Sequence, residues 1–200
     1  MKTLIKKSLL VVAVLATTLT IANEDRTFSV NANAEKTTVS INDVEEGQQL
    51  SIIDQNNIVI YKETINKNGN YNKTFDLTAL PNGDYFFELE KTLKVHTIPF
   101  TVAYNNVTFN KDKETVVYKP SVRLKNELLF VSQLSTRKAP LKIELFFDKD
   151  FNGDYELIHT ETLENDITLD KVFKLSEKEK GNYKLVFTTE GRVFEEKFDL

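Results

Sequence analysis

Side chains that carry oxygen gather in one polar segment of the second half of the chain. They are Asp148, Asp150, Asn152 and Asp154, with Gly153 before the last of them. Calcium takes six to eight oxygen ligands, and the common calcium loop begins with oxygens at positions 1, 3 and 5 and glycine at position 6. Position 12 of that template, usually glutamate, is His159 here. The segment therefore predicts either a calcium site or a polar hairpin tip whose Asn-Gly pair makes the turn.

No other pattern in the chain predicts a catalytic or cofactor-binding residue. There is no cysteine, and the only two histidines, His96 and His159, could complete a tetrahedral zinc site only together with acidic residues. The sequence contains no Gly-x-Ser-x-Gly elbow, no Walker loop and no dinucleotide-binding fingerprint. Neighbouring carboxylates such as Glu45 and Glu46 would point to opposite faces of a strand. We therefore expect that the protein is not an enzyme, and a small hydrolase is the catalytic alternative.

The N-terminal segment has the pattern of a secretory signal peptide. Its charged start contains Lys2, Lys6 and Lys7. An apolar run over residues 9–16 follows and continues weakly to residue 22, which is shorter than the ~20 residues of a membrane-spanning helix. We expect residues 1–22 to be the signal peptide, residues 23–36 to be a spacer, and no membrane span to be left after cleavage. Cleavage after Ala34 and an uncleaved anchor are the alternatives.

Charge and composition limit the classes of partner. The formal net charge of −4 becomes −7 when residues 1–22 are removed, because that segment has three lysines and no acidic residue. An acidic surface repels phosphate backbones and anionic lipids, so neither nucleic acid nor a membrane surface is an expected partner. Without cysteine the exported chain has no disulfides, and packing of its 40% hydrophobic residues must hold the fold together.

The chain repeats itself at an offset of 98 residues. The matching segments are 63–65 with 161–163, 75–78 with 173–176, and 83–85 with 181–183. Further upstream, Asp54 and Asp148 match at an offset of 94. The second copy thus has about four additional residues between Lys149 and Tyr155, a length change that a surface hairpin loop tolerates.

Each copy reads as short strands separated by turn signals such as Asn-Asn, Asn-Gly and Pro-Asn-Gly. From Tyr85 to Leu89 every second residue is apolar, which is the period of a half-buried strand. We therefore expect an all-β fold with two tandem antiparallel β-sandwich modules after the signal peptide, over residues 37–110 and 111–200. One larger sandwich made of all the strands is the alternative.

The segment Leu80-Pro81-Asn82-Gly83-Asp84-Tyr85 resembles the tyrosine corner of immunoglobulin-like and fibronectin-type-III-like sandwiches. In those folds the tyrosine hydroxyl bonds back to the backbone of the preceding loop. The resemblance implies that both tandem modules are antiparallel immunoglobulin-like β-sandwiches. The second copy has a looser version of the corner, with Lys178 and Glu179 in place of the Leu-Pro pair.

A longer pattern is similar to the C-terminal sorting domains of proteins exported by the type IX secretion system of Bacteroidota. It consists of Ile52-Ile53-Asp54, then Ile58-Val59-Ile60-Tyr61, then the segment from Phe75 to Phe86. In that family an aspartate-turn hairpin precedes a Leu-Pro-x-Gly-x-Tyr corner, and the module is immunoglobulin-like. The resemblance covers residues 48–90 closely and 141–189 loosely, and it implies export.

From these observations we expect an exported, non-catalytic protein that acts as a structural or protein-interaction module at the bacterial envelope or outside the cell. Its expected partner is another envelope or extracellular protein, and its expected location is the periplasm or the medium. A glycan- or calcium-binding accessory protein is the alternative. Phe86, Tyr104 and Tyr118 are the exposed aromatic residues that could stack on a sugar ring or anchor a partner.

Overall fold

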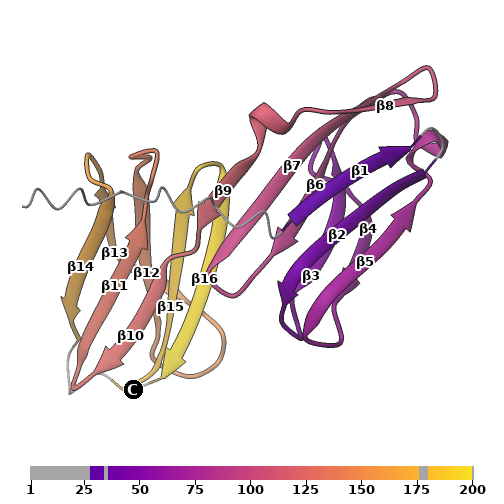
Figure 1. Ribbon diagram of the computed structural model, residues 1–200. Coiled ribbons are helices and arrows are strands. Elements are labelled where there is room, and N and C mark those ends of the chain that lie inside the picture. Colours follow the sequence, from indigo (N-terminus) through magenta and orange to yellow (C-terminus); the bar gives the residue numbers. More distant parts are fainter. Residues whose placement is uncertain (1–27, 34–35, 176–179, 200) are drawn as a thin grey trace, which may run out of the picture.

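The computed structural model describes residues 28–33, 36–175 and 180–199, and within these ranges the chain consists of β-strands with no α-helix (Figure 1). The strands of the first half are β1 (Phe28–Asn33), β2 (Lys36–Val44), β3 (Gln49–Asp54), β4 (Val59–Thr64), β5 (Gly69–Phe75), β6 (Gly83–Glu90), β7 (Lys94–Ala103), β8 (Asn106–Phe109) and β9 (Thr115–Tyr118). Those of the second half are β10 (Ser121–Lys125), β11 (Leu128–Leu134), β12 (Leu141–Asp148), β13 (Glu156–Leu163), β14 (Thr168–Lys174), β15 (Asn182–Thr189) and β16 (Arg192–Asp199). Two short 3-10 turns, η1 (Leu77–Ala79) and η2 (Lys111–Lys113), complete the described elements.

Strand pairing divides these elements into two β-sandwiches, here called the first and second modules. In the first module a sheet of order β1-β2-β5 faces a sheet of order β4-β3-β6-β7, and both β8 and β9 pair with β7. In the second module the sheets have the orders β10-β11-β14 and β13-β12-β15-β16. All these pairs are antiparallel, and the corresponding strands of the two modules follow one another in the same order. The all-β immunoglobulin-like sandwich fold predicted from the sequence is therefore confirmed.

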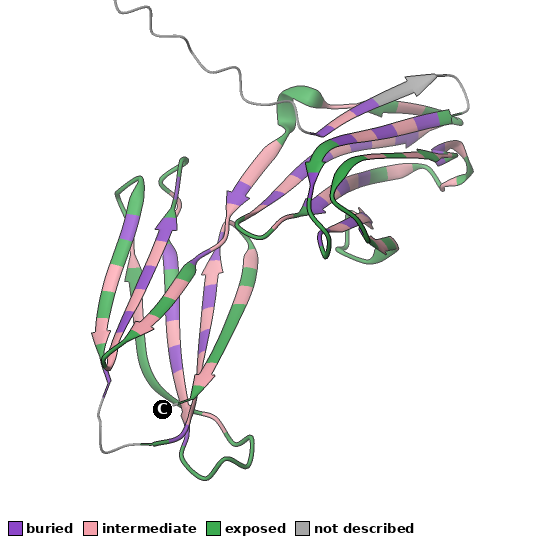
Figure 2. Ribbon diagram, turned by 60° about the horizontal axis from the view of Figure 1, so that its bottom comes forward, coloured by how far each residue is buried: buried purple, intermediate pink, exposed green. Residues whose placement is uncertain are grey.

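Alternating burial explains why these residues form strands. In β6 Tyr85, Phe87 and Leu89 are buried, while the residues between them are half-buried. Figure 2 shows buried positions alternating with less buried ones along the strands. The corresponding residues of β15 are buried in the same way. Each module has a hydrophobic cluster of its own, which contains side chains from both of its sheets. Since fully burying one such apolar side chain stabilises a fold by roughly 1.5–3 kcal/mol, this alternation fixes the strand register.

Two predicted boundaries differ from the structure, and the predicted signal peptide lies outside the described residues. Part of the predicted spacer, residues 23–36, is strand β1, which pairs with β2 and buries Phe28 and Val30 in the first core. Strand β9, predicted to begin the second module, pairs with β7 of the first module instead. Its Val117 is buried opposite Val95, so this polar-flanked segment contributes to the edge of the first sandwich.

The two modules also touch through polar side chains. Arg192 of β16 forms an ion pair with Glu88 of β6, and it also bonds the Thr97 hydroxyl at 2.9 Å. Near the connection, the Gln133 side chain of β11 donates to the backbone carbonyl of Tyr118 at 2.8 Å. Figure 2 shows the modules meeting at an angle beside the segment between β9 and β10.

Candidate functional site

The predicted calcium segment forms the loop between β12 and β13. Asp148, at the end of β12, is buried, and its carboxylate accepts hydrogen bonds from inside the loop. The backbone N–H groups of Asn152 and Gly153 donate to it at 3.3 and 2.9 Å, and the side chain of Asn182 on β15 donates at 3.4 Å. Burial alone would raise the pKa of Asp148, but these donors together hold it below its usual value.

The other predicted ligands are held in the same loop or point into solvent. The Asn152 side chain accepts a bond from the Asp154 backbone at 2.9 Å, and its amide nitrogen donates to the Asp154 carboxylate at 3.1 Å. Asp150 is exposed. Among the described residues no group of three or more acidic or histidine side chains is placed to hold a metal ion. Asp148, Asn152 and Asp154 thus lie close together because their hydrogen bonds close the turn. Calcium binding at this loop stays a prediction.

The first module has a similar aspartate at the matching hairpin. The Asp54 carboxylate accepts the backbone N–H groups of Asn56 and Ile58, both at 2.8 Å. These bonds, led by the one from Ile58, lower the pKa of Asp54. Both hairpins are therefore closed by an aspartate that caps the N–H groups of its own loop, which is the local conformation that Asp favours in turns.

The two histidines occupy separate places in the fold. His96 on β7 is largely buried, with its ring edge against Phe28 and its Nε2 atom 3.4 Å from Glu114. Burial lowers the pKa of His96 despite this carboxylate, which favours the neutral ring at pH 7. His159 on β13 lies 3.4 Å from Glu161 in the second module. Neither geometry joins a histidine to a second histidine or to a nucleophile.

A cross-sheet ion pair recurs at the same place in both modules. In the first module Glu63 of β4 bonds Lys73 of β5 and the hydroxyls of Tyr61 and Tyr71. The bond from Lys73, followed by that from Tyr61, lowers the pKa of Glu63. In the second module the corresponding pair is Glu161 and Lys171, and that lysine is the main cause of the lowered pKa of Glu161. These pairs bridge the two sheets on one side of each sandwich.

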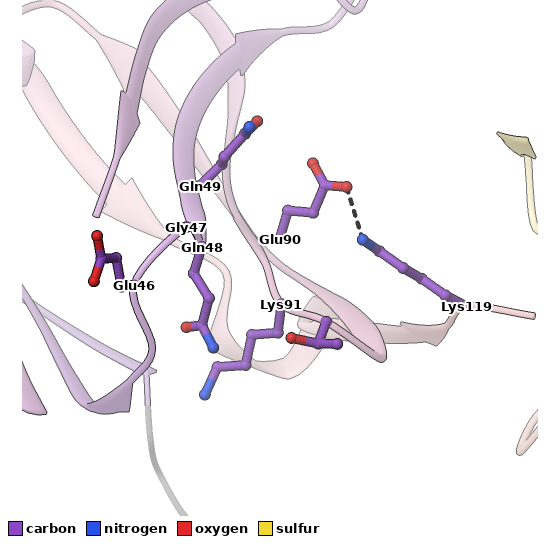
Figure 3. A pocket seen from close by; sticks show the side chains of 8 residues that line it. Glu46, Gly47, Gln48, Gln49, Glu90, Lys91 and Lys119 are labelled. Carbon is purple, nitrogen blue, oxygen red and sulfur yellow. Dashed lines mark hydrogen bonds and ion pairs between the residues drawn. The ribbon is translucent and has the colours of Figure 1, made fainter. Parts of the chain in front are cut away.

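The first module has two adjoining hollows at the end where β2, β6 and β9 meet the turns, together called the Gln48 pocket. Figure 3 shows the side chains that line one of them. Their volumes are about 270 and 340 Å³. Both hollows are lined by Gln48, Lys91 and Thr92. Two turns build the pocket, one between β2 and β3 and the other between β6 and β7. The first turn contains Gly47 at a φ of +92°, a conformation that glycine adopts without strain.

Two polar side chains in this pocket lack full pairing. Gln48 is only 6% exposed, and its Oε1 atom has no hydrogen-bond partner in the described part of the chain. Its Nε2 atom makes one long contact of 3.5 Å to Glu45. Lys91, half-buried beside it, has neither an ion pair nor a side-chain hydrogen bond among the described residues. Burial, and then the charge of Lys94, lower the pKa of Lys91. Figure 3 shows the two side chains extending in the same direction.

Sequence reasoning did not find the Gln48 pocket, because its residues come from turns that carry no motif. The departure from the second copy appears only in the strand register, because the sequence offset of 94 would set Gln48 against Lys142. Gln49 pairs with Glu90 as Lys142 pairs with Thr188, so Leu141 and Thr189 of the second module stand where Gln48 and Lys91 stand in the first. A buried glutamine in place of a leucine is a departure that core packing does not require.

The predicted exposed aromatic residues have three different environments. Tyr104 is 87% exposed at the turn between β7 and β8. Phe86 is half-buried on the outer face of its sheet, between Ile53 and Pro99 of the neighbouring strands. Tyr118 is half-buried and lines the Gln48 pocket.

The tyrosine corner predicted from the sequence is present in the first module. The Tyr85 hydroxyl donates a hydrogen bond of 2.8 Å to the backbone carbonyl of Pro81. Tyr85 is buried and stacks on Phe100 at 5.4 Å between ring centroids. The corner therefore ties the connection after η1 to the start of β6, as in immunoglobulin-like sandwiches.

A family model described as a secretion system C-terminal sorting domain matches residues 26–102. No curated protein matches the sequence. No helix in the described ranges has the length and apolar character needed to cross a membrane.

Solved structures with some likeness include a biofilm-associated protein BSP domain, at 10% identity and a TM-score of 0.29 over 87% of this chain. Another is the FN1–FN3 region of chicken CNTN1, at 10% identity and a TM-score of 0.26 over 86% of this chain. A third is native alpha-2-macroglobulin from Escherichia coli, domains MG0-NIE-MG1, at 15% identity and a TM-score of 0.26 over 86% of this chain. The chain spans 29%, 65% and 69% of these structures, respectively. The fold assignment rests on the strand pairing above, and the resemblance of the first module to secretion system C-terminal sorting domains is confirmed over residues 26–102.

Proposed function

We propose that this chain is an exported, non-catalytic protein whose two tandem β-sandwich modules act as a structural or protein-interaction module at the bacterial envelope or outside the cell. The observation that carries the proposal is the match of residues 26–102 to secretion system C-terminal sorting domains. The tyrosine corner and the Asp54 hairpin within that range support it. In this proposal residues 1–22 are a signal peptide removed on export, and the mature protein is periplasmic or secreted.

The surface of the modules supports an interaction role. The outer strand β4 exposes Val59 and Ile60, at 54% and 44%, and the outer strand β13 exposes Leu157 and Ile158, at 52% and 50%. Outer strands also carry backbone N–H and C=O groups that are free to pair with another chain. Both features favour an extracellular or envelope protein as the partner over nucleic acid or a membrane surface, which the mature charge of −7 opposes.

The test of export is localisation of the full chain in a Bacteroidota host with a type IX system and in the same host without it. We expect a processed protein that starts after residue 22 in the periplasm of both strains, with passage to the surface or medium only where the system is intact. An unprocessed protein confined to the cytoplasm of both strains would refute the proposal.

The interaction role is tested separately by placing a photo-crosslinking amino acid at Ile60, Ile158 or Tyr104 in the exported chain. We expect a discrete crosslinked product with one envelope or extracellular protein from at least one of these positions. Lys36, an exposed position at the start of β2, provides the matched control. A chain that is exported but crosslinks to nothing would support export and contradict the interaction role.

A further inference from the structure

The outer edge of the larger sheet differs between the two modules. In the first module both β8 and β9 pair with β7, so the outer side of that strand is covered along most of its length. In the second module the corresponding strand is β16, and no described strand pairs with its outer side. Strand β16 pairs with β15 over eight residue pairs without an irregularity. It therefore presents a regular row of backbone N–H and C=O groups that can pair with a further strand.

Strand β8 contributes to the core of the first module as well as to its sheet. Its Val107 and Phe109 pack against the first hydrophobic cluster, and the Phe109 ring lies 5.4 Å from the ring of Phe100. On β7 itself, the inward-facing residues Ile98 and Phe100 are each only 1% exposed. A strand added at this edge thus supplies apolar side chains together with backbone hydrogen bonds.

The matching residues of the second module are more accessible. Tyr183 pairs with Phe198 as Tyr85 pairs with Phe100, so Glu196 of β16 stands where Ile98 stands in β7. Phe198 is half-buried, and Glu196 is exposed. The inner face of β16 therefore lacks the cover that β7 has.

The strand that faces β16 from the other sheet shows the same difference. In the first module β1 lies across from β7, since the rings of Phe28 and His96 are 5.2 Å apart. The counterpart of β1 in the second module is β10. Val122 of β10 is half-buried, whereas Val30, at the matching place in β1, is 3% exposed. The side of the second sandwich between β10 and β16, here called the β10–β16 seam, is therefore less covered than the same side of the first.

Glu196 places a negative charge at the middle of this seam. It lies opposite Leu185, which is fully buried, and residues directly opposite each other in adjacent strands point to the same face. Glu196 has neither an ion pair nor a side-chain hydrogen bond among the described residues. An inward-pointing charge on an outer strand opposes pairing with a purely apolar strand. A strand that brings a cation to this position would instead gain a charge-assisted hydrogen bond.

The inner positions of β16 specify the sequence pattern of such a strand. Phe194 and Phe198 pack against the second core on either side of Glu196, and both are half-buried. Because side chains alternate along a strand, the incoming strand would carry an apolar residue, a lysine or arginine, and a second apolar residue at every second position. Covering the exposed parts of the two rings favours the apolar residues. The formal net charge of −4 also attracts a basic partner over an acidic one.

We propose that the outer edge of β16 and the β10–β16 seam are the docking site for a β-strand of a partner protein with the pattern apolar-x-basic-x-apolar. The partner strand pairs with the β16 backbone as β8 pairs with β7, and its basic side chain bonds Glu196. This inference rests on the proposed interaction role, and it gives that role a surface and a partner of defined chemistry.

The test uses the full exported chain and three synthetic peptides. The first is acetyl-Thr-Phe-Thr-Lys-Thr-Phe-Thr-amide, the second has Glu in place of Lys, and the third is the first peptide with every residue N-methylated. Binding is followed by ¹⁵N NMR titration. We expect the lysine peptide to give saturable shifts in residues 192–199 and 121–125. The glutamate peptide should bind at least about tenfold more weakly, and the N-methylated peptide should not bind because it cannot donate backbone hydrogen bonds.

Two variants of β16 separate the seam from the overall charge. Glu196→Lys should reverse the preference, so that the glutamate peptide binds more tightly than the lysine peptide. Glu195→Lys makes the same change of charge one residue away, on the face that Val186 shares, and it should keep the preference of the parent. Both glutamates are exposed, so neither substitution should prevent folding.

The proposal is wrong if the lysine peptide does not bind, or if its shifts lie along β4 or β13 instead of β16. It is also wrong if Glu196→Lys and Glu195→Lys change the preference equally, since the overall charge would then decide. Sedimentation that shows dimers of the parent with protected β16 amides would make a second copy the occupant and overturn the partner strand. None of these results bears on export or on crosslinks from Ile60, Ile158 or Tyr104, so failure of this site is distinct from failure of the proposed function.

Discussion

Arg192 and Glu88 join the two modules across 104 positions of sequence. The two terminal nitrogens of the Arg192 guanidinium, Nη1 and Nη2, both donate to the Glu88 carboxylate, Nη1 at 3.3 Å. The Thr97 hydroxyl lies between them, since it accepts from Arg192 at 2.9 Å and contacts Glu88 at 3.2 Å. A bidentate contact of this kind fixes the relative orientation of the guanidinium and the carboxylate as well as their distance. Together with the bond from Gln133 to the Tyr118 carbonyl, this contact constrains the relative orientation of the modules.

Arg192→Ala should loosen the modules without unfolding either of them. The hydrophobic clusters of the two modules are separate, so removing a contact between them leaves both cores intact. We expect small-angle X-ray scattering to show a broader distribution of distances, with a melting temperature within about 2 °C of the parent. The charge exchange Arg192→Glu with Glu88→Arg should restore the parent distribution. An unchanged scattering profile for Arg192→Ala would show that the linker alone sets the orientation.

Tyr85→Phe should destabilise the first module by about 1–3 kcal/mol, because the Pro81 carbonyl loses its donor while the ring stays buried. The measurement is equilibrium unfolding in urea, with an unchanged m-value as the sign that only stability has changed. Tyr104→Phe removes a hydroxyl from a side chain that is 87% exposed, and it should change the unfolding free energy by less than about 0.5 kcal/mol. Equal effects of the two substitutions would argue against the corner as a stabilising contact.

Much of this fold could be predicted from sequence because the information is local. The alternation from Tyr85 to Leu89 marks an inward face, and the Leu-Pro-x-Gly-x-Tyr corner marks the start of β6. The Asp54 turn likewise depends on one side chain and the four residues after it. Each of these features is decided by neighbours in sequence, so a single chain reveals them.

The parts that the sequence did not predict depend on pairing between distant segments. Strand β9 has apolar residues that would suit either module, and only its register with β7 assigns it to the first. The unpaired state of Gln48 depends on which groups the β6–β7 turn brings near it. The contact between Arg192 and Glu88 depends on how the modules meet. None of these three features can be predicted from the spacing of residues along the chain.

The stability of both modules should fall in acid through the cross-sheet pairs. The pKa values of Glu63 and Glu161 lie below the ordinary 4.5 in the folded protein, chiefly because Lys73 and Lys171 bond them. A lowered folded pKa contributes stability that is present above pH 4.5 and is lost as the pH falls through the folded value. Since both pairs are partly exposed, each contribution is at most about 1 kcal/mol.

The measurement is the unfolding free energy at pH 6 and at pH 3 for the parent and for the double variant Lys73→Met with Lys171→Met. The difference between the two pH values should be smaller in the variant by up to about 2 kcal/mol, because both carboxyls then titrate nearer their ordinary value. Lys62→Met removes an exposed lysine of β4 and should leave the difference as in the parent. If the variant loses as much stability in acid as the parent does, contacts other than these two ion pairs cause the loss.

Asp148→Asn should lower the melting temperature of the second module in the absence of calcium. The change weakens the bonds from the Asn152 and Gly153 backbones, which close the loop around the Asp148 carboxylate. Asp150→Ala should have no such effect, because Asp150 is exposed. Both variants and the parent are melted with and without 5 mM calcium. A calcium-dependent rise in the parent that is lost in Asp150→Ala would instead make the segment a metal site.

Processing of the exported chain should occur after residue 22 and not after Ala34. Strand β1 (Phe28–Asn33) pairs with β2 along six residue pairs and buries Phe28 and Val30, so the later cut would remove an outer strand and two core side chains. N-terminal sequencing of the protein recovered from the periplasm or medium reports the cut directly. A chain shortened to begin at Glu35 should be destabilised by about 3 kcal/mol or more, since each buried apolar side chain contributes roughly 1.5–3 kcal/mol. Recovery of a stable protein that begins at Glu35 would show that β1 is dispensable and that the second cleavage site is the one used.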